Sequence, residues 1–287
     1  MKKNTILIMG GNGFLGSYLY DHLQKIKKYK LFKQSRKSFA DVTFNPNNKK
    51  ELFKNLETIK PNIIINLISC TELDKCEANV EYTINTNIGI LENISSFVRF
   101  NKKIYFINIS TDQLYSLKGR NDEDCVFPIN FYAISKFLGE KYVLESGGCN
   151  LRVNFIGRNL KSKSFLDWAY FNLMKNKRIN GYNNIEFNPL SVEKLCELII
   201  EVIEKKLKGN FNIGSDGKIT KYQVLKIFEK KLGKKKLVKK SKYNNKKNLL
   251  LRPENMVMSN LKLKKYLKLR NNSIQKNVNR ALQKFHA

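Results

Sequence analysis

The run Gly10-Gly11-Asn12-Gly13-Phe14-Leu15-Gly16 decides how the rest of the chain is interpreted. It follows the apolar stretch 5–9 directly and opens a stretch with helical spacing, which is the setting of a dinucleotide-binding turn. Glycine lets the backbone turn tightly and approach a pyrophosphate, and the first N–H groups of the following helix attract the phosphates. The alternative is a glycine-rich turn without a ligand. We predict a dinucleotide site whose contacts come from Gly10, Gly13, Phe14, Leu15 and Gly16.

Short apolar runs alternate with amphipathic stretches through the first half of the chain. The apolar runs are expected to be strands, at residues 5–9, 30–34, 62–67, 103–109 and 150–155. The stretches between them are expected to be helices, at residues 14–27, 49–58, 82–100 and 131–145. This alternation is typical of parallel strands joined by crossover helices. We therefore predict an α/β fold with a Rossmann-type doubly wound parallel sheet, which binds its ligands at the carboxyl ends of the strands.

Beyond residue 158 the rhythm changes and the expected elements become shorter. Helices are predicted at 165–175, 192–205, 222–232 and 261–267, and short strands at 185–187 and 211–213. We expect an NADP(H)-binding Rossmann domain over residues 1–158, to which residues 188–213 return. The segments 159–187 and 214–287 would form a smaller C-terminal substrate-binding lobe.

The residues after the second expected strand bear on the choice of cofactor. In NAD-binding units an Asp or Glu lies roughly 20 residues beyond the glycine turn and binds the ribose hydroxyls. Here that place is held by Ser35, Arg36 and Lys37, which would bind a 2′-phosphate through charge-assisted hydrogen bonds. NADP(H) is therefore favoured over NAD(H), unless these residues are only further surface cations of a basic protein.

Positive charge is the strongest signal in the composition, with 54 Lys and Arg against 24 Asp and Glu and a formal net charge of +30. Such a charge would suit a nucleic acid or an acidic membrane surface. The excess is mostly lysine spread along the chain, and no nucleic-acid-binding motif accompanies it, so nucleic acid is a disfavoured partner. No apolar run reaches the ~20 residues that span a bilayer. We expect a cytoplasmic protein without a membrane span.

Metal and disulfide chemistry have little support in the sequence. The five cysteines are odd in number and form no Cys-x-x-Cys pair, and the chain has only two histidines. Neither a disulfide framework, nor a zinc site, nor a Ser-His-Asp triad is indicated. We assign no metal, and a reducing compartment fits best.

A tyrosine and a lysine four residues apart supply the clearest candidate chemistry. Tyr132 and Lys136 would lie on one face of the helix predicted there. A tyrosine titrates near pH ~10, and a neighbouring ammonium favours the phenolate and lowers that value. Upstream, the stretch 106–112 resembles a strand that ends in hydroxyl groups, and Thr111 could hydrogen-bond a reacting oxygen. The bland alternative for the pair is an ordinary exposed helix contact.

Taken with the glycine turn, these residues resemble the extended short-chain dehydrogenase/reductase family over most of the chain. Within it the chain is most similar to the dTDP-4-dehydrorhamnose reductase branch and related sugar-nucleotide reductases. The matching stretches follow in order at 61–66, 71–77, 110–112, 132–136 with Gly139-Glu140, 151–152, 212–214 and 252–253.

The resemblance implies a division of roles among these residues. Thr111, Tyr132 and Lys136 would be the catalytic set, with Asn85 as a helper. Cofactor contacts are implied for Asp41, Val42 and Asn66 as well as for Tyr132 and Lys136. In such enzymes the nicotinamide delivers hydride to a sugar keto carbon, the tyrosine protonates the alkoxide, the lysine holds the ribose and the threonine orients the carbonyl.

One difference from the family's pattern narrows the range of activities that the resemblance implies. Related 4,6-dehydratases have Asp-Glu after the threonine, where this chain has Asp112-Gln113, and glutamine has no titratable proton. The leading hypothesis is therefore an NADP(H)-dependent reductase of a nucleoside-diphosphate 4-keto sugar, in deoxysugar or surface polysaccharide biosynthesis. The alternatives are an NAD-dependent sugar-nucleotide 4-epimerase and a catalytically silent dinucleotide-binding regulatory subunit. The sequence leaves the sugar, the nucleotide and the oligomeric state open, with a homodimer as one option.

Overall fold

The computed structural model describes residues 3–36, 39–119, 121–159, 161, 164–246 and 250–286. The chain divides into two compact units. Unit 1 consists of Met1–Thr111, Asn130–Arg152 and Cys196–Phe211. Unit 2 consists of Asp112–Ile129, Val153–Leu195 and Asn212–Ala287.

A seven-stranded sheet forms the centre of unit 1, in the order β11-β6-β5-β4-β1-β2-β3. Its strands are β1 (Asn4–Met9), β2 (Tyr29–Ser35), β3 (Val42–Thr43), β4 (Ile63–Asn66), β5 (Tyr105–Thr111), β6 (Cys149–Val153) and β11 (Gly209–Ile213). β1 pairs in parallel with both β2 and β4, and β4 pairs in parallel with β5. The order reverses on the two sides of β1, which confirms the predicted Rossmann-type doubly wound sheet.

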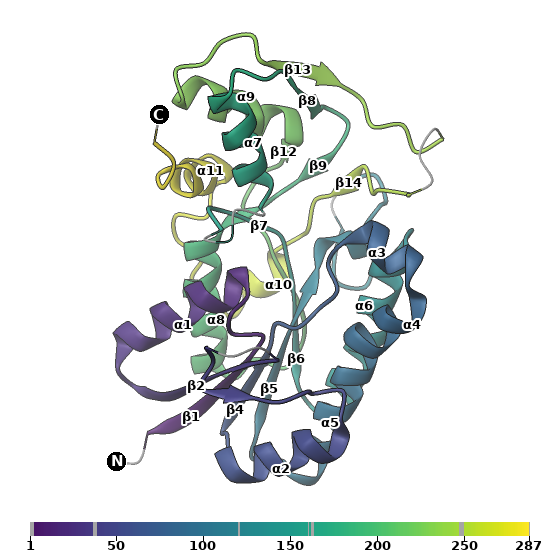
Figure 1. Cartoon of the computed structure of the whole chain (residues 1–287), viewed down its shortest axis with the longest axis vertical. Coiled ribbons are helices and arrows are strands. Elements are labelled where there is room, and N and C mark those ends of the chain that lie inside the picture. The colour runs from purple at the N-terminus through teal and green to yellow at the C-terminus, as the bar shows by residue number, and fades with distance from the viewer. Residues whose placement is uncertain are drawn as a thin grey trace. The chain divides into compact units, whose positions relative to one another are not determined.

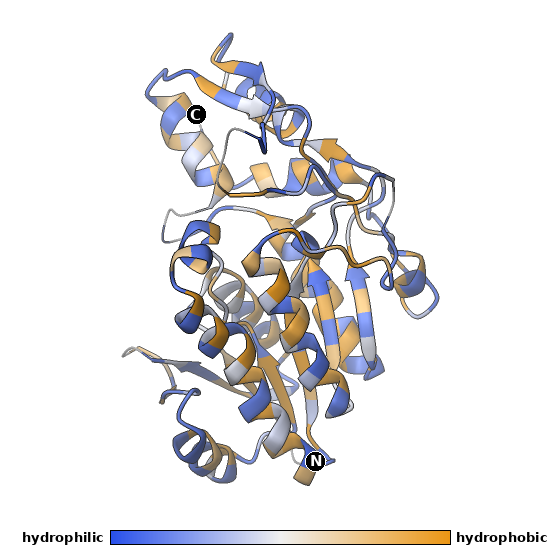
Figure 2. Cartoon of the chain, turned by 90° about the vertical axis from the view of Figure 1, so that its right-hand side faces the viewer, coloured by the Kyte–Doolittle hydropathy of each residue, from blue (hydrophilic) through white to orange (hydrophobic). Residues whose placement is uncertain are grey.

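Helices cover both faces of this sheet (Figure 1). α1 (Phe14–Ile26) lies on one face, and α2 (Lys49–Ile59), α5 (Ile90–Phe100) and α6 (Phe131–Glu145) lie on the other. The central strand β1 is mostly apolar and deeply buried, and Ile6, Leu7 and Ile8 have no exposed surface. The helices instead combine apolar and polar residues, as Figure 2 shows, because each buries one side against the sheet.

The segment after β4 contains the helix predicted over 82–100, with two additions. Residues 80–100 are helical throughout, as α4 (Val80–Ile84), a π-helical segment η1 (Asn85–Gly89) and α5, and a short helix α3 (Leu73–Ala78) that had not been predicted precedes them. Asn79 separates α3 from α4, because its side-chain oxygen accepts a hydrogen bond from the Tyr82 N–H and caps the second helix. Segments of π-helix are rare and occur often at functional sites.

Unit 2 consists of small sheets and short helices around its own core. Its strands are β7 (Phe155–Ile156), β8 (Ile179–Tyr182), β9 (Glu186–Phe187), β10 (Leu190–Ser191), β12 (Ile219–Thr220), β13 (Val238–Ser241) and β14 (Asn255–Met256). Its helices are η2 (Asp112–Leu114), α7 (Phe165–Met174), α9 (Lys221–Lys231), α10 (Leu261–Lys264) and α11 (Ile274–Leu282), and α8 (Val192–Lys205) begins in it. The rings of Tyr170, Phe228 and Phe285, from α7, α9 and the end of the chain, contact one another in the core. Helix α11 and the two-residue strands of this unit had not been predicted, apart from β9.

Candidate active site

The glycine turn has the geometry that a bound pyrophosphate requires. Gly10 has a φ of +75°, and the Gly13 N–H donates to its carbonyl at 2.9 Å. A Cβ at Gly16 would lie 2.6 Å from the Gly10 oxygen, so only glycine fits there. Gly13 caps α1 without any side-chain hydrogen bond, which leaves the helix N-terminus open to an anion. Phe14 and Leu15 form the first turn of α1, so the predicted contacts lie together.

The residues predicted to read the ribose lie at the end of β2, close to this turn. The Gly11 N–H donates to the Gln34 carbonyl at 3.0 Å, and Ser35 and the exposed Arg36 follow directly. The Asp41 carboxylate accepts a hydrogen bond from the Lys33 N–H at 2.7 Å. Val42 begins β3, which pairs with the end of β2. Lys37, predicted with Ser35 and Arg36, lies outside the described residues.

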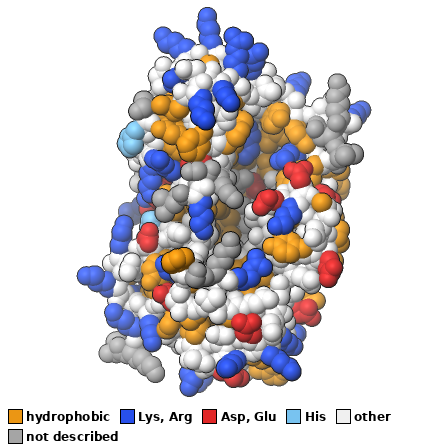
Figure 3. All heavy atoms as spheres, viewed as in Figure 1, with side chains coloured by type: hydrophobic (Ala, Val, Ile, Leu, Met, Phe, Trp, Pro, Cys, Tyr) orange, Lys and Arg blue, Asp and Glu red, His pale blue; other side chains and the backbone are white. Residues whose placement is uncertain are grey.

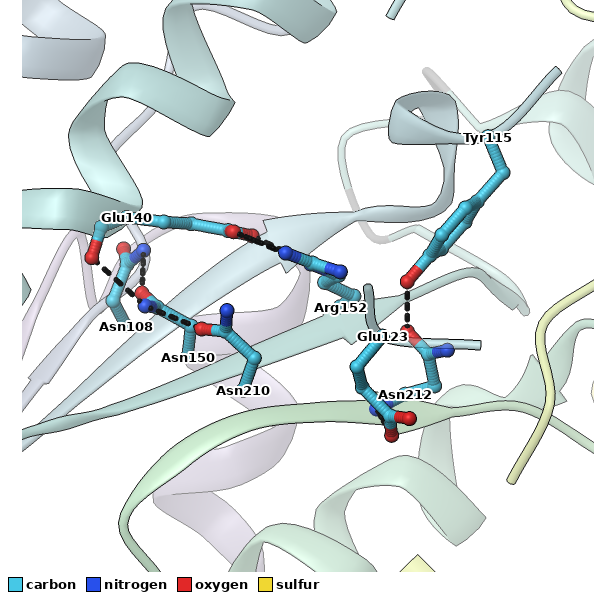
Figure 4. Close-up of polar contacts among 8 residues, drawn as sticks. All are labelled: Asn108, Tyr115, Glu123, Glu140, Asn150, Arg152, Asn210 and Asn212. Atoms are coloured by element: carbon cyan, nitrogen blue, oxygen red, sulfur yellow. Dashed lines mark hydrogen bonds and ion pairs between the residues drawn. The ribbon is translucent and has the colours of Figure 1, made fainter. Parts of the chain in front are cut away.

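Four asparagines form a chain of hydrogen bonds across neighbouring strands. Asn66 on β4 donates to Asn108 on β5 at 3.1 Å, Asn108 donates to Asn150 on β6 at 2.9 Å, and Asn150 donates to Asn210 on β11 at 3.0 Å. Figure 4 shows the last three side chains in line. Asn66, a predicted cofactor contact, is the last residue of β4, and its side chain also hydrogen-bonds to the backbone of Ile68. The sequence feature that could have revealed this chain of hydrogen bonds is an asparagine in each of the four strands.

Helix α6 brings Tyr132 and Lys136 to the carboxyl end of β5. Its first turn is held by the Asn130 side chain, which accepts from the Ala133 N–H at 2.9 Å. Tyr132 is 8% exposed and Lys136 only 2% exposed. The Lys136 ammonium donates to the Ile109 carbonyl at 2.8 Å, two residues before the buried Thr111. Tyr132 and Lys136 therefore lie on one face of α6, and Lys136 anchors that face to β5, the strand that ends in Thr111.

Burial changes the acidity of this lysine. Loss of water around its ammonium lowers the pKa of Lys136 to about 8, and the negative charge of Glu140, one turn further along α6, opposes that change. Glu140 is itself paired with Arg152 of β6 at 2.7 Å, and both side chains are 1% exposed. Figure 4 shows the carboxylate and the guanidinium end to end. The pair ties α6 to the sheet immediately behind Lys136.

The π-helical segment contains two asparagines with different surroundings. Asn85, the predicted helper, is exposed at the first position of η1. Asn87 is buried, and its oxygen accepts from Ser69 Oγ at 2.9 Å and from the Cys70 N–H at 2.8 Å. Its nitrogen donates to Ser135 Oγ on α6 at 2.9 Å. Sequence reasoning missed Asn87, which joins the loop after β4 to the helix of Tyr132 and Lys136.

The segment that follows Thr111 belongs to unit 2 and is anchored there. Asp112 accepts a hydrogen bond from the Asn154 amide. The hydroxyl of the buried Tyr115 donates to Asn212 at 2.6 Å, and the Asn212 N–H donates to Glu123 at 2.9 Å (Figure 4). Asn212 belongs to the stretch 212–214, which the sequence had marked, so its amide holds the segment between Thr111 and α6 to β11.

Two further properties concern the part of the chain that the structure describes. It contains no group of three or more His, Cys, Asp and Glu side chains that could hold a metal ion. None of its helices has both the length and the apolar character needed to cross a bilayer.

A glycine turn after β1, a doubly wound sheet and a Tyr–Lys pair one helical turn apart define a nicotinamide-dinucleotide-binding oxidoreductase of the extended short-chain dehydrogenase/reductase class. Within that class the chain belongs to the RmlD substrate binding domain family, whose sequence profile matches residues 4–287.

Similar proteins cover several activities. The dTDP-4-dehydrorhamnose reductase of Bacillus anthracis str. Ames, solved in complex with NADP, superimposes with a TM-score of 0.90 at 20% identity, over 99% of this chain and 100% of that one. Methionine adenosyltransferase 2 subunit beta of Rattus norvegicus is 25% identical over 77% of this chain and 70% of its own length. The dTDP-4-dehydrorhamnose reductase of Aggregatibacter actinomycetemcomitans is 30% identical, over 48% of this chain and 46% of its own.

Proposed function

We propose that the protein is an NADP(H)-dependent reductase of a nucleoside-diphosphate 4-keto sugar, in deoxysugar or surface polysaccharide biosynthesis. The observation that supports this best is the buried Lys136, whose ammonium is fixed to the carbonyl of Ile109 on the strand that ends in Thr111, one helical turn from Tyr132. The names of the reductases that the chain resembles point to the same chemistry.

Each side chain has one task in this proposal. The bound cofactor supplies the hydride. Tyr132 donates the proton to the oxygen of the reduced carbonyl, and the Lys136 ammonium favours the phenolate that remains. Thr111 donates a hydrogen bond to the same oxygen and orients it. Asn85, exposed at the first position of η1, is kept as the candidate helper.

Preference for NADP(H) over NAD(H) is part of the proposal. Arg36 is exposed directly after β2, at the place where NAD-binding units have an acidic residue, and a guanidinium binds a phosphate in two parallel hydrogen bonds. Affinities for NADPH and NADH, measured with the wild-type protein and with Arg36→Ala, test this preference. We expect the variant to lose affinity for NADPH alone, and equal losses for both cofactors would contradict the role.

The activity is tested by following loss of NADPH absorbance with a panel of nucleoside-diphosphate 4-keto sugars. We expect turnover with at least one of them. Tyr132→Phe should lower kcat by about 100-fold or more, because general acid catalysis contributes about 10²–10⁴-fold, and it should leave NADPH affinity unchanged. Tyr142→Phe makes the same change elsewhere on α6 and is the control. Full activity of Tyr132→Phe would remove the assigned proton donor.

A second candidate function is regulation. Methionine adenosyltransferase 2 subunit beta, which is named as a subunit, aligns with 77% of this chain. A protein of that kind would bind the dinucleotide without turnover. NADPH binding with no reduction of any sugar nucleotide in the panel would favour this candidate. A tightly held NAD(H) that is not exchanged during turnover would instead favour the 4-epimerase.

A further inference from the structure

Two loops of unit 2 bring basic side chains together. β8 and β13 are parallel, with Val238 opposite Ile179, and the Ile179 N–H donates to the Leu237 carbonyl at 2.9 Å. The chain that enters β8 therefore lies beside the chain that enters β13. The Lys234 ammonium joins the two loops, because it donates to the Asn176 side chain at 2.9 Å. The basic end of unit 2 consists of the cations of both loops, which are Lys175, Lys177, Arg178, Lys234, Lys235 and Lys236.

Few carboxylates oppose these charges. Residues 168–185 and 230–253 contain no Asp or Glu. The helices and strands that adjoin the two loops, α7, β8, α9 and β13, contain only Asp167 and Glu229. Asp167 is buried in the first turn of α7, at the end away from Lys175, and Glu229 is paired with Lys226. With both carboxylates counted as charged, the loops retain a clear excess of positive charge.

The helix dipole accounts for only part of this basic end. α7 ends at Met174, and a cation near the C-terminus of a helix is stabilised by the partial negative charge there. Lys175 fits that role. Arg178, Lys235 and Lys236 are exposed and lie beyond the last turns of α7 and α9. These cations repel one another, and an anionic partner would relieve that repulsion.

An exposed aromatic face of α7 leads to the basic end. Trp168, Phe171 and Lys175 follow one another at helical spacing and therefore share one face. The Trp168 side chain is 46% exposed and that of Phe171 is 44% exposed. The indole is stacked on the Phe165 ring, with centroids 6.3 Å apart. Figure 3 shows hydrophobic side chains next to Lys and Arg at the upper end of the visible face, where Figure 1 has α7, α9 and β13.

This combination of side chains favours one kind of polyanion. An anionic lipid bilayer attracts clustered lysines, and it takes up Trp and Phe rings at the level of its headgroups. A nucleic acid would need the rings within the row of cations, so that bases stack while phosphates are bound. Here the rings lie along α7 and the cations lie at its end. A second copy of this chain would bring cations against cations.

We propose that Trp168, Phe171 and the basic end form a surface that binds the protein to an anionic lipid bilayer. The two rings enter the boundary between headgroups and acyl chains, and the cations bind the lipid phosphates. The surface lies within unit 2 and uses none of the candidate catalytic residues. This inference is therefore independent of the proposed reductase activity, and either can fail without the other.

The test uses Trp168 as its own reporter, because it is the only tryptophan of the chain. The full chain is mixed with vesicles of phosphatidylcholine alone, or of equal parts phosphatidylcholine and phosphatidylglycerol. Sedimentation measures the partition coefficient, and the emission spectrum measures the polarity around the indole. At about 20 mM NaCl we expect binding to the anionic vesicles only, with a blue shift of the emission, and a partition coefficient about 10-fold lower at about 150 mM.

Charge variants test the basic end. Lys177→Gln/Lys235→Gln/Lys236→Gln should lower the partition coefficient by about 100-fold, since each lysine near an anionic bilayer contributes about fivefold. The matched control is Lys50→Gln/Lys54→Gln/Lys60→Gln, which removes the same charge from exposed positions of unit 1. It should change the coefficient by less than about threefold, because charges beyond the screening length act weakly.

A phenylalanine variant tests the aromatic face. Phe171→Ala should lower the partition coefficient by about fivefold, because half of the ring is available for burial in lipid. Phe100→Ala removes an 87% exposed phenylalanine from unit 1 and should leave it unchanged. Unchanged Tm values of all variants show that no loss comes from unfolding.

Three results would overturn the surface: equal losses for the two lysine variants, equal binding to vesicles of phosphatidylcholine alone, and sedimentation without a blue shift. A random-sequence DNA duplex is titrated in parallel. If the wild-type protein binds the duplex but no vesicles, and Lys177→Gln/Lys235→Gln/Lys236→Gln weakens that binding, the basic end is a nucleic-acid site and the lipid proposal is wrong.

Discussion

Lys136 is both deeply buried and a candidate catalytic residue. The ammonium is present below its lowered pKa of about 8 and is lost as the pH rises through that value. Catalysis that needs this charge should therefore fall on the alkaline side, with a midpoint near 8, well below the 10.5 of a free lysine. The measurement is kcat/KM for NADPH-dependent reduction from pH 6 to about 10.

Lys136→Arg is the control for that profile. A guanidinium stays charged throughout this range, so the variant should lose the alkaline fall even if its altered geometry lowers the rate at every pH. A wild-type rate that stays constant up to pH 9.5 or beyond, or an unchanged fall in the arginine variant, would show that another group is responsible.

A comparison of Tyr132 and Lys136 with Asn87 shows which residues of the candidate site can be predicted from the sequence alone. Tyr132 and Lys136 could be predicted, because four-residue spacing puts both on one helix face and the local geometry needs no further information. Asn87 could not, because its role arises from Ser69, Cys70 and Ser135, which only the folded chain brings to it. Spacing identifies pairs within one element, whereas contacts between elements depend on packing.

At the scale of elements, the packing of α6 on η1 depends on one glycine. A Cβ at Gly139 would clash with the Asn87 carbonyl and lie 2.6 Å from Leu91 Cδ1. We expect Gly139→Ala to destabilise the protein by about 1–3 kcal/mol, the usual range for overpacking. Gly89→Ala is the control, since its nearest neighbours lie at 4.0 Å and alanine favours a helix. Chemical denaturation of both variants measures the difference, and equal stability would contradict the tight packing.

The buried ion pair Glu140–Arg152 joins α6 to β6 and is a second contact that holds elements of unit 1 together. Arg152→Met leaves the Glu140 carboxylate without its 2.7 Å partner in a place that is 1% exposed. Removing one partner of such a pair lowers the free energy of unfolding by roughly 3–5 kcal/mol, whereas replacing both partners by apolar residues can leave it unchanged. We expect a large fall in Tm for Arg152→Met and partial or full recovery in Glu140→Leu/Arg152→Met. A mild single variant would mean that water reaches the carboxylate.

The elements of unit 1 were predictable, and those of unit 2 were less so, for a physical reason. β1, β4 and β5 are buried on both faces and appear in the sequence as apolar runs bounded by polar residues. β7, β10, β12 and β14 have two residues each, which is too short for any periodicity. The break between α3 and α4 has a local signal at Asn79, which caps α4. The π-helical segment η1 has no such signal, and it packs closely on α6 at Gly139.

Over the whole molecule the charge is strongly unbalanced. The formal net charge is +30, and Figure 3 shows Lys and Arg side chains over much of the visible face, including the part of unit 2 that bears α9 and β13, with fewer Asp and Glu. This field attracts anionic cofactors and nucleotide sugars. It also opposes the compact state, because like charges that folding brings together repel one another.

That repulsion should make the stability of the protein depend on salt. Raising NaCl from about 10 to 150 mM shortens the screening length from about 30 to about 8 Å, so mutual repulsion weakens and the Tm should rise by a few degrees. Replacing exposed lysines by glutamine acts on the same repulsion without salt. Lys235→Gln/Lys239→Gln/Lys240→Gln, all at exposed positions, should raise the Tm at 10 mM NaCl and reduce its rise with salt. A Tm that falls with salt, or a triple variant with an unchanged salt response, would mean that local ion pairs such as Lys218–Glu186, and not the overall charge, dominate the electrostatics of folding.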